Sequence, residues 1–297
     1  MYRPKNYSWS ASNAFNDCGQ KVYYKRVLGL PERPGVGLLL GTLGDEIVMG
    51  TNGYFADVIR TGEPEPNRGY ATDFEKDANQ RFKEVKDSLH PEEQDEFSDS
   101  IPRVKTLIQE YCQPECTMHK HLKPIAIQSE YNVRFKGLRV PIKGYSDLVA
   151  YHADTERYVV VDMKVQKRKA NGGTVGQRYQ IGFYGFAEMM KRDLDYLPVG
   201  EIHCFVRKKN PELEHTMFPC HQDDVTQVLQ LTLNYQFGIE SNYWPLNRQS
   251  NLCNPKYCSF YDRCHKDNER DIQVLKDLYE TTPTKENVRI VDFNNRA

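Results

Sequence analysis

The feature that most constrains the fold of this chain is a set of three runs rich in apolar residues between residues 124 and 164. Two of them, Ile125–Phe135 and Leu138–Tyr151, flank the turn residues Lys136 and Gly137, which is typical of a β-hairpin. The third run, Tyr158–Lys164, contains three consecutive valines, as expected for a strand that is buried on both faces. The sequence therefore predicts a sheet around these three runs.

Before and after these three runs, the spacing of apolar residues changes between that of helices and that of strands. Ser10 and Ser12 are both suitable N-caps for a helix that continues toward Leu28, and a second helix begins near Leu38. Later in the chain we expect a helix over 176–191 whose apolar stripe is Tyr179, Phe183, Phe186 and Met190. Two strands at 201–207 and 213–218 and a last helix at 223–239 should follow it. This order predicts an α/β fold with a central mixed sheet flanked by helices.

Residues 62–123 differ in composition from the rest of the chain. Between residues 73 and 99 there are ten acidic and four basic side chains, few apolar ones and a helical spacing. We interpret 62–123 as a solvated helical insertion, and a flexible linker is the alternative.

The overall composition narrows the class of protein. The net charge of −1 over 297 residues provides no global attraction to nucleic acid, so any basic binding surface must be local. No stretch approaches the roughly 18 apolar residues of a membrane span, and the N-terminus lacks the apolar run of a secretory signal. We expect a cytoplasmic protein with no membrane partner; the oligomeric state is not predicted.

Two acidic residues and one lysine on neighbouring strands form the first candidate site. Asp162 and Lys164 are two apart on one strand and so share a face, and pairing of the strands through the turn at 153–156 brings Asp147 near Asp162. Two carboxylates can hold Mg²⁺ or Mn²⁺, and a lysine beside them can stabilise charge during phosphodiester hydrolysis. The alternative is a surface strand with solvated side chains, but the valines before Asp162 favour a buried strand.

The order Asp147, Asp162-Met-Lys164 and then Gln180-Ile-Gly-Phe-Tyr184 resembles the RecB-like nucleases of the PD-(D/E)XK superfamily. The resemblance implies a restriction-endonuclease-like core, with Gln180 and Tyr184 on a helix that faces the active site and the DNA backbone. It covers residues of about 10–50 and 125–265.

Two further acids could join the metal site under this resemblance. Glu130 matches a recurrent glutamate of the family, and a strand-end surface residue is the alternative. Many members carry a histidine ligand on an early helix, where Gly41-Thr-Leu-Gly-Asp45 has aspartate. Asp45 can also bind Mg²⁺ or Mn²⁺; the alternatives are that Glu46 is the acid or that Asp45 is an ordinary helix residue.

Clustered cysteines indicate a second metal centre, because disulfides are rare in the cytoplasm. Cys253, Cys258 and Cys264 lie within a dozen residues, and Cys18 is the fourth candidate. Four thiolates suit either a [4Fe–4S] cluster or Zn²⁺. The order of one N-terminal and three C-terminal cysteines is similar to Fe–S nucleases of the same superfamily, including the AddB nuclease domain and CRISPR-associated RecB-like exonucleases, and this resemblance favours iron–sulfur.

The domain organisation follows from these motifs. We expect one nuclease domain over 1–270, with a cluster-binding segment at 244–266 that ties the C-terminal end to the N-terminal helix, and a C-terminal helix and tail over 271–297.

A further pair of cysteines has zinc-like spacing. Cys112 and Cys116 are followed by His119 and His121, and together they offer two thiols and two imidazoles. We favour the simpler interpretation, a loop at the end of the insertion helix, because the two histidines are close together for one ion.

The candidate DNA contacts are basic residues between the catalytic strand and the following helix: Lys167, Arg168, Lys169 and Arg178. The segment that carries them contains no acidic residue, and lysine and arginine beside such a site would neutralise backbone phosphates. A solvated loop is the alternative.

The function that these motifs predict is a Mg²⁺- or Mn²⁺-dependent deoxyribonuclease. The resemblance favours an exonuclease on single-stranded DNA or frayed DNA ends that acts in recombination, repair or replication, and a phage or plasmid origin. The alternatives are a structure-specific endonuclease of the same superfamily and a non-catalytic DNA-binding or assembly protein that keeps the fold.

Overall fold

The computed structural model describes residues 2–44, 70–113, 115–118, 120–167 and 174–267. The chain divides into two units, Met1–Ser250 and Asn251–Ala297. The sheet belongs to the first unit. The predicted helix at 271–297 lies outside the described residues.

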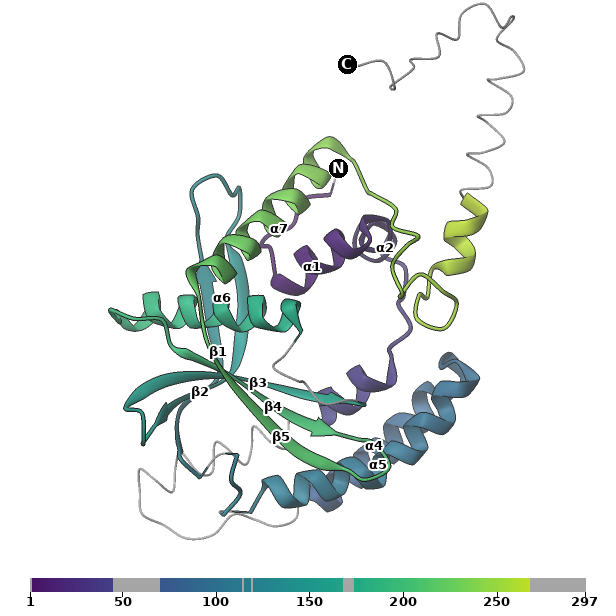
Figure 1. Ribbon diagram of the computed structural model, residues 1–297. Coiled ribbons are helices and arrows are strands. Elements are labelled where there is room, and N and C mark those ends of the chain that lie inside the picture. The colour runs from purple at the N-terminus through teal and green to yellow at the C-terminus, as the bar shows by residue number, and fades with distance from the viewer. Residues whose placement is uncertain (1, 45–69, 114, 119, 168–173, 268–297) are drawn as a thin grey trace, which may run out of the picture. The chain divides into compact units, whose positions relative to one another are not determined.

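The first unit is built on a five-stranded mixed sheet in the order β1-β2-β3-β4-β5 (Figure 1). All neighbouring strands are antiparallel except β3 and β4, which are parallel. The strands are β1 (Leu122–Val133), β2 (Ile142–His152), β3 (Arg157–Gln166), β4 (Val199–Val206) and β5 (Glu212–Pro219). The predicted hairpin, the valine strand and the two later strands are all confirmed, and so is the α/β fold class.

The central strand β3 explains why three valines follow one another. Val160 packs into the core on one face of the sheet, whereas Val159 and Val161 pack into the core on the other face. All three are fully buried, and each contributes roughly 1.5–3 kcal/mol by leaving water. Hence β3 is the strand around which both layers are built.

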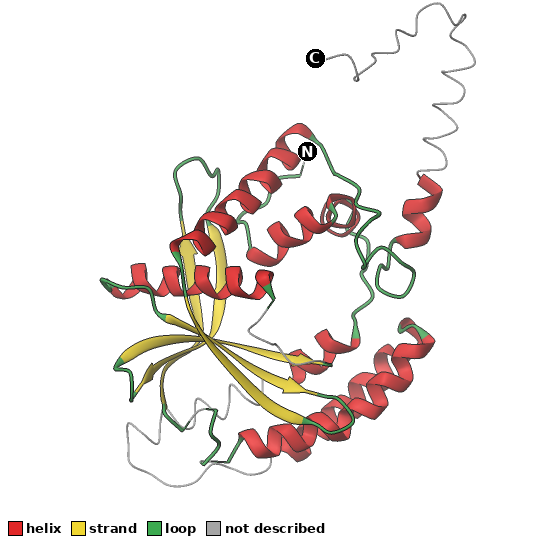
Figure 2. Cartoon of the chain, in the orientation of Figure 1, coloured by secondary structure: helices red, strands yellow, loops and turns green. Residues whose placement is uncertain are grey.

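Three helices cover one face of the sheet: α1 (Trp9–Asp17), α6 (Val175–Arg192) and α7 (Gln222–Ser241) (Figure 2). Phe15, Phe183 and Tyr235 from these helices share one core with residues of β2, β3 and β4. The N-cap of helix α6 is Thr174, whose hydroxyl accepts a hydrogen bond from the Gln177 amide at 3.3 Å. The helices predicted over 176–191 and 223–239 are thus confirmed.

The opposite face is covered by α4 (Tyr70–Val85), α5 (Pro91–Tyr111) and a helix over residues 36–44. The segment predicted as an insertion is helical, but the expectation that it is solvated is wrong for α5, and a flexible linker is excluded for both helices. Phe97, Leu107 and Ile108 are fully buried. Most acidic residues of α5 occupy the outer face of an amphipathic helix, whereas Glu93 is buried and Glu96 is partly buried, and the apolar residues form its inner face.

The N-terminal helix differs from the prediction in its cap and its length. Its N-cap is Ser8, whereas Ser12 is buried and hydrogen-bonds with Thr232. The helix is interrupted at Cys18, which is extended, before α2 (Gly19–Val22) and a π-helical turn (Tyr23–Val27). Gly19 is required after this break, because a Cβ there would lie 2.5 Å from Cδ of Pro245.

The apolar stripe predicted on α6 is only partly buried. Phe183 lies in the core, but Met190 at the end of the stripe is 61% exposed. The buried face also includes Ile181, Tyr184 and Ala187. Among the described residues, no helix has both the length and the hydropathy needed to cross a membrane.

The second unit is described over residues 251–267. It consists of turns around Cys253 and Cys258 followed by a helix over 261–267.

Candidate active site

The candidate active site lies where β2 separates from β3. The last paired residues of these strands are Leu148 and Val161, whereas β2 continues to pair with β1 as far as Ile142. At the separation point, Oδ2 of Asp147 accepts a hydrogen bond from the Met163 amide at 2.9 Å. The side chain of Asp147 thus takes the place of a backbone acceptor, and it is held beside Asp162.

Asp162 and Lys164 form an ion pair on β3. The Lys164 Nζ lies 2.6 Å from Oδ2 of Asp162, whose side chain is 1% exposed, while that of Lys164 is 30% exposed. No hydrogen bond from the described residues satisfies Oδ2 of Asp162, so its compensation comes from the charge of Lys164. The structure thus brings together Asp147, Asp162 and Lys164, as the sequence predicted.

Helix α6 places Gln180 and Tyr184 over this group. Nε2 of Gln180 donates to Oδ1 of Asp162 at 3.3 Å and to the hydroxyl of Tyr184 at 2.5 Å. The i, i+4 spacing puts both side chains on one helix face, and the capped first turn of α6 holds Gln180 there. Gln180 therefore contacts Asp162 directly, and Tyr184 is linked to this carboxylate through Gln180.

One residue of the site, Tyr131 on β1, was missed by sequence reasoning. Its hydroxyl shares a hydrogen bond with Tyr184, and the two rings lie 5.5 Å apart. Tyr131 pairs in register with Gly144, and a Cβ at Gly144 would lie 2.2 Å from the Tyr131 hydroxyl. The signal was the glycine in Gly144-Tyr-Ser-Asp147, which leaves room for a ring on the neighbouring strand.

The electrostatics of the site favour a bound cation. Burial and, after it, the nearby charge of Asp162 raise the pKa of Asp147 to about 6, against the attraction of Lys164 and the hydrogen bond from the Met163 amide. Burial also raises the pKa of Tyr184 well above its ordinary value, so this phenol is neutral at pH 7. Two carboxylates with one amine leave uncompensated negative charge, and oxygen donors are the ligands that Mg²⁺ and Mn²⁺ prefer. The residues fit a hard divalent cation.

The other acids predicted for the metal do not join this group in the described chain. Glu130 is exposed and interacts with Lys143 at 2.8 Å and with the Tyr145 hydroxyl at 3.1 Å. Hydrogen bonds from these two residues lower the pKa of Glu130. Asp45 and Glu46 lie outside the described residues. Among those described, no group of three or more His, Cys, Asp or Glu side chains could hold a metal ion.

The predicted DNA contacts are only partly described, since Arg168 and Lys169 lie outside the described residues. Lys167 forms an ion pair with Glu96 of α5 at 2.5 Å, and its side chain is 57% exposed. Arg178, in the first turn of α6, lies over the Phe218 ring at 6.0 Å.

The four cysteines of the predicted thiol site are divided between the two units. Cys18 belongs to the first unit, and Cys253, Cys258 and Cys264 belong to the second. Within the second unit the three described thiols do not form a metal-binding group.

The second Cys/His segment carries no metal-binding group in its described residues either. Cys112 caps the end of α5, Cys116 is buried, and His121 pairs with Asp154 at 2.9 Å. His119 lies outside the described residues.

Comparison with solved structures finds a fold match to the crystal structure of a protein from Eubacterium rectale named "Putative exonuclease". The TM-score is 0.52 at 14% sequence identity, and the match covers 84% of this chain and 87% of that one. A second crystal structure, of the protein SSO0001, matches at a TM-score of 0.35 and 12% identity over 71% of this chain and 92% of that one. No curated protein sequence is significantly similar to this chain.

The family comparison covers almost the whole described chain. The model of the PD-(D/E)XK nuclease superfamily matches residues 6–265, a range that includes the sheet, the carboxylate pair and α6. The chain therefore belongs to the PD-(D/E)XK nuclease superfamily.

Proposed function

We propose that this protein is a Mg²⁺- or Mn²⁺-dependent deoxyribonuclease that acts as an exonuclease on single-stranded DNA or frayed DNA ends, in recombination, repair or replication. The observation that carries the proposal is the convergence of Asp147, Asp162 and Lys164 at the point where β2 leaves β3. Superfamily membership supports the nuclease activity, and the fold match to a protein named as an exonuclease agrees with it.

Each residue of the site has a role in this proposal. Asp147 and Asp162 would hold the divalent cation, which supplies Lewis-acid activation of water and neutralises charge on the phosphate when bound. Lys164 stabilises the negative charge that develops on the phosphate oxygens. Gln180 orients Asp162 through its hydrogen bond, and Tyr184 fixes the amide of Gln180. The positively charged amine of Lys164 cannot bind the cation, and the two carboxylates cannot stabilise negative charge on the phosphate, so the roles are distinct.

The test is degradation of end-labelled single-stranded DNA with Mg²⁺ or Mn²⁺. Wild-type protein should cut, chelation by EDTA should stop the reaction, and Lys164→Ala should lower the rate by at least about 100-fold. Lys123→Ala removes an exposed lysine outside the site and serves as the matched control. Equal rates for wild type and Lys164→Ala would remove the proposed site.

Circular single-stranded DNA separates the competing functions. An exonuclease leaves the circle intact while it degrades the linear form, whereas a structure-specific endonuclease opens circles that contain a hairpin. Binding without cleavage of either substrate in Mg²⁺ or Mn²⁺ would identify a non-catalytic DNA-binding protein.

We propose in addition that Cys18, Cys253, Cys258 and Cys264 bind a [4Fe–4S] cluster, with Zn²⁺ as the alternative; the support is the order and spacing of the cysteines. Anaerobically purified protein should absorb broadly in the blue and contain iron. Cys258→Ala should bleach this absorbance and lower the melting temperature, and Cys112→Ala should change neither. Zinc without iron would favour the Zn²⁺ alternative. Purified protein that contains neither iron nor zinc would refute both forms of the metal site.

A further inference from the structure

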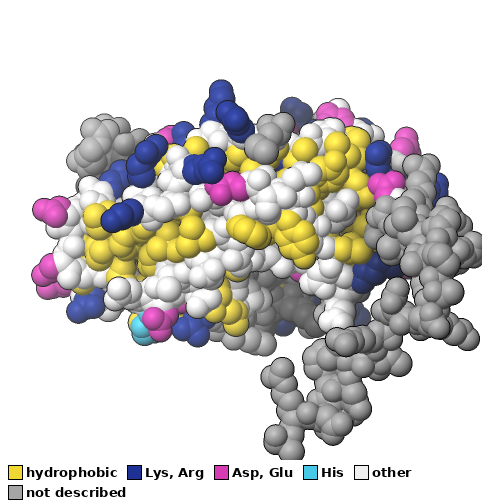
Figure 3. Space-filling model, turned by 90° about the horizontal axis from the view of Figure 1, so that it is seen from above, with side chains coloured by type: hydrophobic (Ala, Val, Ile, Leu, Met, Phe, Trp, Pro, Cys, Tyr) yellow, Lys and Arg dark blue, Asp and Glu magenta, His cyan; other side chains and the backbone are white. Residues whose placement is uncertain are grey.

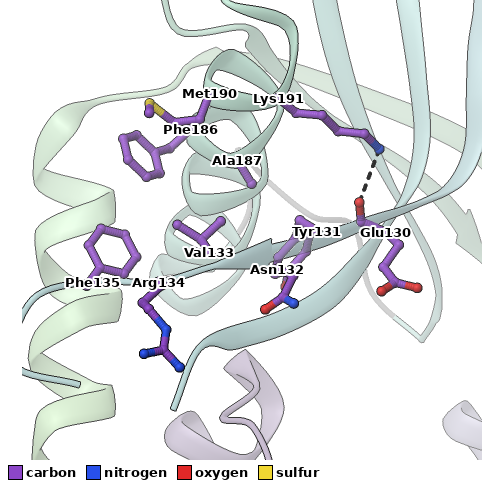
Figure 4. A pocket seen from close by; sticks show the side chains of 10 residues that line it. All are labelled: Glu130, Tyr131, Asn132, Val133, Arg134, Phe135, Phe186, Ala187, Met190 and Lys191. Atoms are coloured by element: carbon purple, nitrogen blue, oxygen red, sulfur yellow. Dashed lines mark hydrogen bonds between the residues drawn. The ribbon is translucent and has the colours of Figure 1, made fainter. Parts of the chain in front are cut away.

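A groove beside the edge strand β1 shares only Tyr131 with the site described above. It has a volume of about 660 Å³ and lies between Glu130–Phe135 of β1 and its following loop, on one side, and the last turns of α6 on the other. Figure 4 shows Phe135, Phe186 and Met190 on one part of the wall, Arg134 beside Phe135, and Lys191 on the opposite part, where its amine donates to the backbone carbonyl of Glu130. The groove thus combines apolar surface with cationic and amide groups.

Aromatic rings connect this groove with the candidate active site. Tyr131, which hydrogen-bonds with Tyr184, lies 5.6 Å from the Phe183 ring, and Phe183 lies 6.1 Å from Phe135. Phe135 in turn stacks on Phe186 at 5.7 Å. The groove is therefore continuous with the wall of the carboxylate site through packed side chains.

The charge of the groove favours an anionic ligand. Its lining has two cations, Arg134 and Lys191, and one acid, Glu130, which is neutralised by the ion pair with Lys143. Arg134 and Asn132 are exposed, and no described residue forms a hydrogen bond or ion pair with either side chain. Figure 3 shows lysine and arginine side chains beside exposed hydrophobic ones on the face of the molecule seen from above.

The shape and chemistry of the groove match unpaired nucleotides better than a duplex. Flat apolar walls stack on the faces of exposed bases, and flanking cations contact phosphates, without a requirement for sequence. In a duplex the bases are stacked on each other and do not present these faces. Exposed Met190, a flexible apolar side chain, is an adaptable surface for different bases.

We propose that this groove is a subsite for unpaired nucleotides of a single-stranded DNA segment next to the phosphate that is cut. The proposal rests on the proposed nuclease function and specifies its substrate class. It places at least one base against Phe135, Phe186 and Met190, and a phosphate within reach of Arg134.

The test measures binding, separately from cleavage. Fluorescence anisotropy with a labelled oligothymidylate of about 16 nucleotides, in EDTA to prevent cutting, compares wild type with Met190→Glu and Arg134→Glu. Both substitutions are at exposed positions and put a carboxylate into the groove. Met217→Glu, the same change at a partly exposed methionine on the other edge strand, is the control.

We expect Met190→Glu and Arg134→Glu to weaken binding of the oligonucleotide about tenfold. Met217→Glu should bind as wild type does, and all variants should keep the wild-type melting temperature. Phe186→Leu, which removes a ring without adding charge, should weaken binding about threefold. If the groove prefers single strands, the groove substitutions should weaken binding of a blunt duplex of the same length less than they weaken binding of the oligothymidylate.

Three results would overturn the subsite: equal dissociation constants for wild type and both groove variants, an equal loss for duplex and single strand, or a change from dimer to monomer in Met190→Glu with DNA binding intact. The last result would identify the groove as an interface between protein chains. Cleavage by wild type together with equal dissociation constants refutes this subsite alone. If wild type does not cleave DNA but the groove variants still bind the oligonucleotide more weakly than wild type does, only the proposed nuclease function is refuted.

Discussion

The candidate active site on β2 and β3 and a second carboxylate cluster just beyond the ends of β3 and β4 have opposite charge balance. In the candidate active site, two acids, Asp147 and Asp162, share one amine. A few residues further along, Glu96 of α5 binds two cations, Lys167 after β3 and Arg207 after β4. The first cluster has one negative charge too many, and the second has one positive charge too many.

The pKa shifts of the two clusters differ in sign accordingly. Burial would raise the pKa of Glu96, but hydrogen bonds and charge from Lys167 and Arg207 outweigh this and lower it. Burial and Asp162 instead raise the pKa of Asp147 to about 6. The Glu96 cluster is complete without a ligand and clamps α5 to the strand ends, whereas the aspartate pair is stabilised by adding a cation. This difference separates a cluster whose acid already has two cationic partners from one whose charge would fit the proposed divalent cation.

The largest expected effect is on catalysis. Asp162→Asn removes a proposed metal ligand and should lower the rate of DNA cleavage about 1,000-fold. Because the substitution also removes one of two like charges, the metal-free protein should stay folded. The rate is measured on end-labelled single-stranded DNA, and circular dichroism checks the fold. Asp99→Asn, an exposed aspartate of α5, is the control and should cut at the wild-type rate.

The second effect is the dependence of stability on pH in metal-free protein. The folded-state pKa of Asp147 is raised from 3.8 to about 6, so its contribution to stability is fully present below about pH 4 and is lost as pH rises through 6. The loss is on the order of 3 kcal/mol. Denaturant unfolding between pH 4 and 8 measures it, and Asp147→Asn should flatten the profile over this window.

Metal binding should reverse this trend. Because the cation binds the ionised carboxylate, affinity for Mn²⁺ should rise as pH increases through 6. Metal affinity that is constant between pH 5 and 7 would contradict the assignment of Asp147 as a ligand.

The third effect concerns the complete cluster. Glu96→Gln leaves the Arg207 guanidinium, 6% exposed, without its carboxylate and should destabilise the protein by about 2 kcal/mol. The pKa of Glu96 is lowered in the folded state, so the stability that it contributes should be present above about pH 4.5 and lost as pH falls. If Glu96→Gln had the same free energy of unfolding as wild type at pH 7, Glu96 would not stabilise the packing of α5 against the strand ends.

The smallest expected effect tests Tyr131. Tyr131→Phe removes the hydrogen bond to Tyr184 and keeps the ring over Gly144, so kcat/KM should fall about fivefold, equivalent to about 1 kcal/mol. The melting temperature should not change. Tyr131→Leu, which also removes the ring, should lower both quantities. A Tyr131→Phe variant with wild-type kcat/KM would limit this residue to packing.

Much of the fold was predictable from local pattern. The hairpin, the valine strand and α6 follow from periods that depend on neighbours in sequence, and the observed ends of these elements lie within four residues of the predicted ones. The expectation of a solvated helix was wrong for α5 because the acidic window 73–99 ends before most of the apolar residues of this helix. Phe97, Val104, Leu107 and Ile108 form one buried face only when a sheet is present to receive them.

The candidate site was predictable to the extent that its spacing was local. Asp162 and Lys164 share a face because they are two apart on a strand, and Gln180 and Tyr184 are neighbours because they are four apart on a helix. Tyr131 was not predictable in this way, because its contact with Tyr184 joins a strand to a helix more than fifty positions away. The same limit applies to Glu96, which meets Lys167 across the two layers.

The sequence by itself determined the candidate site residues and the order of the elements that carry them, since both depend on spacings along the chain. The tertiary structure decided their charge balance, because the net charge of each cluster depends on which side chains distant segments bring within a few ångströms. That packing leaves Asp147 and Asp162 short of positive charge and gives Glu96 two cations, and no period in the sequence encodes this difference.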